Sequence, residues 1–249
     1  MSKFISKQSV ASWYAMTALL ATFLVGQVIL WFFPDGSSMG TSLLFILMNL
    51  IPLIVAAVFS LVLSEVNSLG EFFKKVFLQK ESSLSWILAF FIPVIYYGIS
   101  ILLMNVRFTG NSLLAFFIYF PWTLLYGGLE EVGWRWFLQD HLSYSKHFIP
   151  KMMLLSIVWF LWHIPIYQLP WITAGSSNYL IFYLMILGNA FLFGALKEYS
   201  KGAVPCILAH MLIDSLAVLM LVQSSLTQII LLVIFEIMLA SWLVAMRKS

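Results

Sequence analysis

The sequence predicts an all-α fold, a polytopic membrane bundle of about eight transmembrane helices formed by a single domain over residues 1–249. Hydrophobic residues make up 62% of the chain and charged residues only 9%, whereas a soluble domain carries about 25% charged residues. Several stretches of about 20 residues have almost no charge, which is enough for a helix to cross roughly 30 Å of hydrocarbon. No internal repeat and no long polar linker divides the chain.

The apolar segments follow one another along the whole chain. They lie at residues 11–33, 41–64, 84–105, 112–139, 149–169, 178–196, 203–222 and 225–246. The first segment exceeds the core of a signal peptide, which has about 7 to 15 apolar residues, so we expect an uncleaved span there.

A shorter amphipathic segment separates the second and third spans. Its apolar residues recur at helical spacing beside lysines: Leu69, Phe72, Phe73, Val76 and Phe77, with Lys74, Lys75 and Lys80. This pattern is typical of a helix lying in the membrane interface. The alternative is a solvated connecting loop.

The basic residues predict the orientation of the bundle, because lysine and arginine concentrate in cytoplasmic loops. With these spans, one face receives Lys3, Lys7, Lys74, Lys75, Lys80, Arg135, Lys146, Lys151, Lys197, Lys201, Arg247 and Lys248. Only Arg107 falls on the other face. We therefore expect an integral protein of the cell membrane, in contact with the lipid bilayer, with both termini cytoplasmic. The net charge of +3 requires no nucleic-acid partner.

The single cysteine, Cys206, excludes an internal disulfide and cannot form a thiolate metal site alone. Its ordinary role is that of a small apolar residue within a helix.

Five ionisable residues lie deep within the predicted spans, where a charged side chain costs about 3 kcal/mol or more. At 1.5 Å per residue, Glu130 and Glu131 lie roughly 15 Å below the end of their span. His163 lies roughly 18 Å deep in the next span. His210 and Asp214 lie roughly 10 to 17 Å deep. Three helices therefore bring polar side chains to a common depth, which indicates one shared site.

The spacing of these residues predicts two pairs, since residues four apart share a helix face. Glu131 can pair with Arg135, and His210 with Asp214. Glu130 points about 100° away from Glu131, so we expect it to face the site while Glu131 holds the arginine. Taken singly, each group also fits a structural role. His163 could be a histidine that packs between helices, the glutamates with Arg135 a structural ion pair, and His210 with Asp214 a buried hydrogen-bonded pair.

Three further features adjoin this pattern. The pair Gly127 and Gly128 allows another helix or a peptide to approach the backbone just before the glutamates. Pro165 releases a helical carbonyl close to His163. Glu236, in the last span, fits no constellation and could pack against a polar group such as Asn189.

A carboxylate and two imidazoles in a partly dry cavity suit hydrolysis of an amide. Glutamate can take a proton from water, and histidine can share that task or polarise the carbonyl. Two histidines and a carboxylate also form a common zinc site, for which Glu130, His163, His210 and Asp214 are the candidate ligands. The residues alone leave both routes open.

Three motifs resemble those of a known family. Glu130-Glu131-Val-Gly-Trp-Arg135, then Trp159-Phe-Leu-Trp-His163, then His210-Met-Leu-Ile-Asp214 are similar in order and spacing to the CAAX-protease and bacteriocin-processing family of intramembrane proteases. This family, also called ABI, includes the type II CAAX prenyl endopeptidases. The resemblance covers about residues 110–222.

The resemblance implies an eight-helix fold that cleaves peptides or prenylated proteins near the cytoplasmic face. It implies that Glu130 and His163 activate water. His210 and Asp214 would stabilise the transition state or complete a metal site, and Glu131 with Arg135 would support them. This sequence departs from the family at two positions, with Trp159 where phenylalanine is usual and Asp214 where asparagine is common.

We therefore expect an intramembrane endopeptidase acting on membrane-associated peptides or proteins, by a glutamic or a metal-dependent mechanism. The alternative is a non-catalytic membrane protein of the same fold, such as a bacteriocin-immunity or scaffold factor, or a proton-coupled carrier. A carrier of the common kind would show inverted repeats, and the sequence has none.

Overall fold

A computed structural model describes residues 7–34, 36, 38–143, 147–169, 171–172, 178–222 and 225–248. Two predicted basic residues of the inner face, Lys3 and Lys146, lie outside these ranges. The helices are α1 (Lys7–Phe32), α2 (Met39–Val62), α3 (Leu69–Phe77), α4 (Ser83–Leu102), α5 (Leu113–Thr123), α6 (Gln139–His141), α7 (Phe148–Tyr167), α8 (Tyr179–Tyr199), α9 (Val204–Leu216) and α10 (Leu226–Lys248). Between α5 and α6 lie two π-helical segments, η1 (Leu124–Gly128) and η2 (Val132–Leu138).

The predicted all-α polytopic bundle is confirmed. Within the described residues, six helices are long and apolar enough to cross a membrane, namely α1, α2, α4, α7, α8 and α10. The predicted fourth span is a pair of helices bent by 45° and can count as a seventh. The predicted seventh span is the shorter α9, so the count of eight is not confirmed.

A small two-stranded sheet forms from the segments that follow α4 and α9. The predicted span 203–222 is helical only as far as Leu216, and the strand β2 (Met220–Val222) follows. It pairs antiparallel with β1 (Val106–Phe108). The side chains of Thr109 and Asn111 bond the carbonyl of Val218, at 2.6 and 2.9 Å, and so satisfy a backbone group that the end of α9 leaves free. The sequence analysis did not predict this sheet.

The predicted amphipathic helix between the second and third spans is present as α3, so the alternative of a loop is wrong. Ser68 caps it by accepting a hydrogen bond from the backbone of Glu71, at 3.1 Å. Bonds from the backbone of Asn67 and from Lys75 lower the pKa of Glu71 to about 2. Phe72 is buried on the inner side of the helix. Its position at a membrane interface stays a prediction.

The bend in the fourth span lies just after Gly127 and Gly128, between Gly128 and Val132. The backbone N–H of Leu129 bonds the carbonyl of Leu124 at 3.0 Å, five residues back, as in a π turn. Pro121 lacks the N–H that would continue the α-helical ladder. These π turns flank Glu130 and Glu131, so the two glutamates lie at the irregular part of the span.

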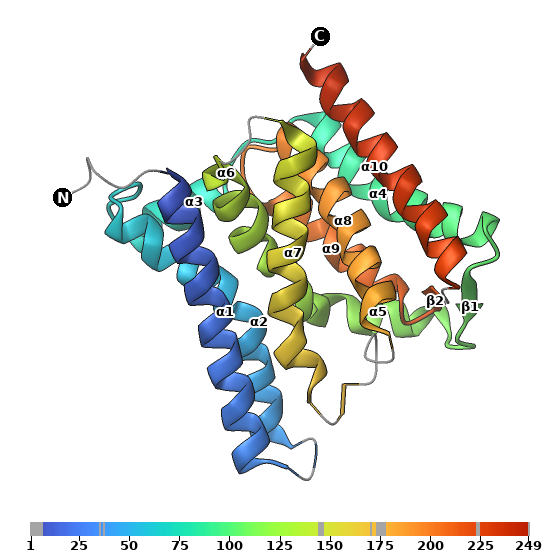
Figure 1. Cartoon of the computed structure of the whole chain (residues 1–249), viewed down its shortest axis with the longest axis horizontal. Helices are drawn as coiled ribbons and strands as arrows, with labels where there is room; N and C mark the ends of the chain where they lie inside the picture. The colour runs from blue at the N-terminus through green and yellow to red at the C-terminus, as the bar shows by residue number, and fades with distance from the viewer. Residues whose placement is uncertain are drawn as a thin grey trace.

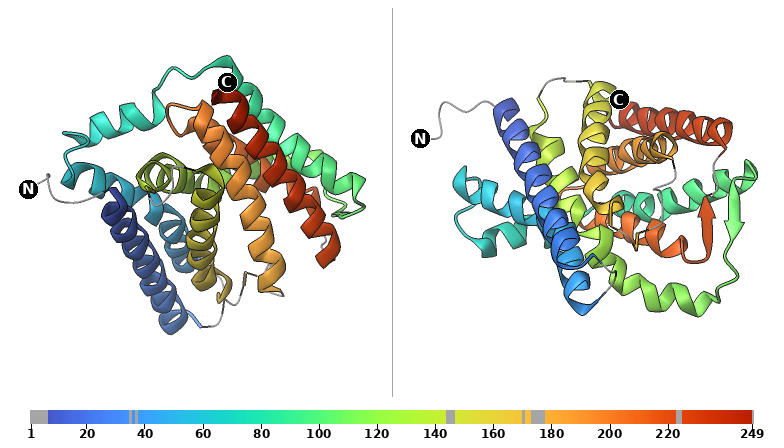
Figure 2. Two further views of the ribbon diagram at one scale, coloured as in Figure 1. Left: turned by 45° about the horizontal axis from the view of Figure 1, so that its top comes forward. Right: turned by 60° about the horizontal axis from the view of Figure 1, so that its bottom comes forward.

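The long helices form one bundle in which α8 packs against α7 and α10. Figure 1 and Figure 2 show α1 and α2 side by side at one edge of the molecule and α10 at the other. The helix α9 packs against α4, α5 and η1. It therefore brings its polar residues against the bend of the fourth span.

The two ends of the bundle differ in charge. Lys7 begins α1, Lys151 lies in the first turn of α7, Lys197 lies in the last turn of α8, and Arg247 lies near the end of α10. These helix ends lie at the top of Figure 1, the end that we call the basic end, whereas β1 carries Arg107 away from them.

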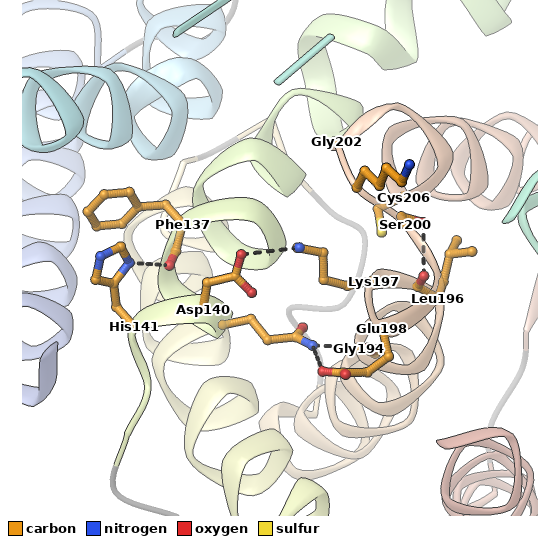
Figure 3. A network of polar contacts seen from close by, with 12 residues as sticks. Phe137, Asp140, His141, Gly194, Leu196, Lys197, Glu198, Ser200, Gly202 and Cys206 are labelled. Carbon is orange, nitrogen blue, oxygen red and sulfur yellow. Dashed lines mark hydrogen bonds and ion pairs between the residues drawn. The ribbon is translucent and has the colours of Figure 1, made fainter. Parts of the chain in front are cut away.

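Polar contacts at the basic end join the fourth span to α8. Figure 3 shows Asp140 of α6 directed toward Lys197 of α8, with 3.1 Å between the carboxylate and the ammonium. Gln139 donates to the carbonyl of Gly194 at 3.0 Å. Cys206 is a free, buried thiol close to this network, as expected.

Candidate active site

Glu131 lies at the centre of the polar cluster and is fully buried. One carboxylate oxygen lies 2.8 Å from Nε of Arg135, which confirms the predicted ion pair. The other oxygen accepts a hydrogen bond from Nδ1 of His210, also at 2.8 Å. Glu131 therefore links the fourth span to α9, a contact that the spacing alone did not predict.

Arg135 is also fully buried, and it pairs with no described acid except Glu131. Its guanidinium carbon lies 4.6 Å from the ring centroid of Trp159 and 5.6 Å from that of Phe193. Such cation–π contacts stabilise a cation where water is absent. The arginine therefore fixes Glu131 in position while aromatic rings cover its charge.

Glu130 is 2% exposed and is held by two indoles. Nε1 of Trp159 donates to its Oε2 at 3.0 Å, and Nε1 of Trp134 donates to the same atom at 3.3 Å. Both bonds use one oxygen, and no described residue donates a hydrogen bond to Oε1. The predicted division of roles between the two glutamates agrees with this geometry.

His163 has its tautomer fixed by the backbone. Its Nδ1 lies 2.8 Å from the carbonyl oxygen of Trp159, and a carbonyl only accepts, so Nδ1 carries the proton. Nε2 of the neutral ring is then a free acceptor. The ring stacks on Tyr167 and meets the edge of Trp162. Trp159 thus contacts both Glu130, through its indole, and His163, through its carbonyl.

His210 and Asp214 form the remaining predicted pair, with 3.5 Å between Nε2 and Oδ2. Because the Glu131 carboxylate accepts from Nδ1, that nitrogen is protonated. A lone pair on Nε2 would face an anionic oxygen, so one proton is shared between Nε2 and Asp214. The Asp214 side chain is 34% exposed, which makes it the open end of the cluster.

Gly127 and Gly128 allow this close approach of α9, as predicted. A Cβ at Gly127 would meet Oδ2 of Asp214 and would lie 3.0 Å from Nε2 of His210. A Cβ at Gly128 would lie 2.8 Å from Met211. The bend of the fourth span and the polar face of α9 therefore require glycine at the contact.

Two cavities meet at Asp214. The main cavity has a volume of about 990 Å³, and its wall includes His163, His210 and Asp214. A second cavity of about 520 Å³ is lined mostly by aromatic and apolar residues and also borders Asp214. A peptide lying across Asp214 would therefore have one part in each cavity.

The predicted site residues thus converge from the bent fourth span, α7 and α9. Residues 111–216 match the family model described as type II CAAX prenyl endopeptidase Rce1-like. This segment of the chain is similar to the Rce1-like family. It contains all three motifs and lies within the predicted range of 110–222. No curated protein matches the chain.

The main cavity of the Rce1-like segment lies away from the basic end. His163 is four residues from the end of α7, and Tyr96 and Tyr97 lie in the last third of α4. Exposed residues at the mouth, Met104 and Arg107, follow α4 directly. The resemblance led us to expect cleavage near the basic end, whereas the main cavity reaches the opposite end of the helices.

The predicted zinc ligands of the Rce1-like site do not form a metal cluster in this arrangement. Within the described ranges, no group of three or more His, Cys, Asp or Glu side chains lies close enough together to hold a metal ion. Indole donors occupy one oxygen of Glu130, and Arg135 and His210 occupy both oxygens of Glu131.

Several residues of the Rce1-like site were not predicted. Trp134 lies one turn from Glu130, so its spacing could have predicted that the two side chains meet. Tyr97 of α4 lines the main cavity and donates to the carbonyl of Ile213 at 2.9 Å, but nothing in the sequence indicated which face of α4 meets α9. Phe193 of α8 covers His210, with ring centroids 5.4 Å apart.

Glu236 lies outside this site, as expected. It is fully buried on α10, and neither carboxyl oxygen has a hydrogen-bond partner among the described residues. The carboxyl group packs against Gly188 of α8. The suggested contact with Asn189 gives no hydrogen bond, and Asn189 instead lines the main cavity.

Proposed function

We propose that this Rce1-like membrane protein is an intramembrane endopeptidase that hydrolyses peptide bonds in membrane-associated peptides or proteins. The observation that carries the proposal is the link made by Trp159. It joins the buried carboxylate of Glu130 to the ring of His163, and His163 lines a cavity of about 990 Å³. A base held beside a cavity is what water activation requires.

In the proposed reaction, a water molecule lies between Glu130 and Nε2 of His163. The carboxylate takes one proton as the water oxygen attacks the carbonyl carbon of the substrate. The proton then passes to the amide nitrogen, and the C–N bond breaks to give a carboxylic acid and an amine, between which the remaining proton moves to leave a carboxylate and an ammonium. The neutral tautomer of His163 suits this role, because Nε2 accepts a bond from the water.

The proton between His210 and Asp214 supplies the second element of the mechanism. A donor aimed at the developing oxyanion typically contributes about 10²-fold or more in rate. Glu131 and Arg135 fix the ring of His210 from behind and do not contact the substrate. This arrangement gives Asp214 a role as a hydrogen-bonding partner of His210, in which an asparagine could replace it.

The orientation follows from the basic residues and is part of the proposal. If the basic end is cytoplasmic, the mouth of the main cavity opens on the extracytoplasmic side. We therefore propose that the substrate is a peptide or a protein segment that reaches the site from that side. Prenylation of the substrate is not required by any of the lining residues.

The test compares the membrane peptides of cells that carry the wild type or Glu130→Gln. The amide keeps the shape of the carboxylate but cannot take the proton, so we expect the same protein level and complete loss of the cleaved products. Glu198→Gln makes the same change at the basic end and should leave the products unchanged. Full processing by Glu130→Gln would overturn the proposal.

A further inference from the structure

Arg107 has no part in the proposed reaction, yet it lines the main cavity together with His163, His210 and Asp214. Among the described lining residues, it is the single lysine or arginine. It is also the one basic residue that the sequence analysis assigned to the face opposite the basic end. A cation at this position therefore needs its own explanation.

The small sheet holds Arg107 in a defined place. In the pairing of β1 with β2, Arg107 lies opposite Leu221, which also lines the main cavity. The contacts of Thr109 and Asn111 with Val218 fix the same turn. Since β2 follows α9 directly, the backbone of Arg107 is held relative to Asp214 at the inner end of the cavity.

The guanidinium of Arg107 has no protein partner within the described ranges, in which it makes no hydrogen bond and no ion pair. The other described arginines do: Arg135 pairs with Glu131, and Arg247 with Glu198. Among the described lining residues, Asp214 is the single carboxylate, and it is paired with His210. The cavity thus has the His210–Asp214 pair at its inner end and an unpaired cation at its mouth.

We propose that Arg107 is a substrate-binding residue that holds a carboxylate of the peptide at the mouth of the main cavity. The planar fork of a guanidinium matches a carboxylate. A fragment released by cleavage would place its new amino group near Asp214 and its carboxylate at Arg107. This orients the substrate with the C-terminal side of the cleaved bond toward the mouth, and it rests on the proposed function for the peptide ligand.

The carboxylate has two chemical sources, a free C-terminus or an acidic side chain. Three fluorescent tetrapeptides of aliphatic residues distinguish them: one with a free C-terminus, one with a C-terminal amide, and one amide that carries a single aspartate. Their binding to the full-length protein in lipid nanodiscs is measured by fluorescence anisotropy. The readout needs no cleavage.

We expect the free acid to bind wild type about tenfold more tightly than the amide, the scale of one charge-assisted hydrogen bond. Arg107→Gln should remove this difference, while Arg107→Lys should keep part of it. Lys80→Gln removes the same charge on the basic side and should change nothing. If the aspartate peptide alone shows the dependence on Arg107, an acidic side chain is the ligand.

Equal binding of all three peptides to wild type, or an unchanged preference in Arg107→Gln, would overturn the carboxylate site. This result is separate from the test of peptidase activity. Cleavage that depends on Glu130 without any preference for a carboxylate would reject only the site. Binding that depends on Arg107 in a protein that cleaves nothing would support the site and reject the peptidase.

Discussion

Trp159 has the most connections of any residue in the candidate site. Its indole N–H bonds Glu130, its carbonyl accepts from His163, and its ring lies under the cation of Arg135. Phenylalanine, the residue usual in the family, would keep the ring and the carbonyl but not the N–H. The departure from the family pattern therefore adds one bond to the proposed base.

Trp159→Phe tests that bond. We expect the protein to fold and its kcat to fall by roughly tenfold. One hydrogen bond to a charged group has a net effect of about 1.5 kcal/mol or more. Steady-state cleavage of a peptide identified in the cellular comparison measures the change. Trp134→Phe removes the longer bond to the same oxygen and should have the smaller effect. A larger effect at Trp134 would contradict the role given to Trp159.

Asp214 is the second departure from the family pattern, and its variants separate the two chemical routes. If it acts by hydrogen bonding, Asp214→Asn keeps substantial activity, because an amide can donate and accept. Asp214→Ala should then lose about a hundredfold in rate. Bound zinc is measured in the same preparations.

A different pattern identifies a metal site. Joint loss of zinc and activity in Asp214→Asn, with recovery on added zinc, would show that the carboxylate is a ligand. An active asparagine variant without zinc would favour activation of water by Glu130 and His163. We expect the second outcome, because Asp214 faces the shared proton of His210.

At the scale of the helices, the bend of the fourth span brings the site together. The π turns place both glutamates in one short segment, and the glycines beside them accept α9. A straight helix with alanine there would hold α9 farther away. The polar cluster therefore depends on the shape of this span as much as on its acidic residues.

Gly127→Ala tests the contact between the two helices. We expect loss of most of the cleavage activity, because the added methyl group would occupy the space of the Asp214 carboxylate. Gly98→Ala is the matched control, since a Cβ at Gly98 of α4 meets nothing within 4 Å. Thermal unfolding and cleavage are measured on both variants. Unchanged activity in Gly127→Ala would show that the approach of α9 is not required.

At the scale of the whole molecule, the charge of the loops and the position of the cavity together decide from which side a substrate enters. The basic residues gather at one end of the helices, and the mouth of the main cavity lies toward the other. This separation leads to a prediction of sidedness that does not depend on the catalytic mechanism.

Cysteine labelling in intact cells measures the sidedness. Met104→Cys, at a position 89% exposed at the mouth, should react with an impermeant maleimide added outside. Lys80→Cys should react only after the membrane is opened. The native Cys206 is buried and gives a low background. The reverse labelling pattern would place the cavity on the cytoplasmic side and both termini outside.

Much of this protein follows from the order of its residues. Long apolar runs require helices in lipid, because each backbone polar group must be bonded within its own segment. The spacing of Glu131 and Arg135 gives their ion pair, and the three motifs give the resemblance to the family. These features depend on neighbours along a helix, so a linear pattern is sufficient to predict them.

Contacts between distant segments were decided only by the tertiary structure. The bond from His210 to Glu131, the indole bonds to Glu130 and the pairing of β1 with β2 depend on how helices rotate and bend against one another. A one-dimensional pattern of apolar residues does not specify that rotation when nearly every face of a helix is apolar. For the same reason, the sequence placed the site residues at one depth, and only the packing of α4, α7, α8 and α9 decided that their cavity opens away from the basic end.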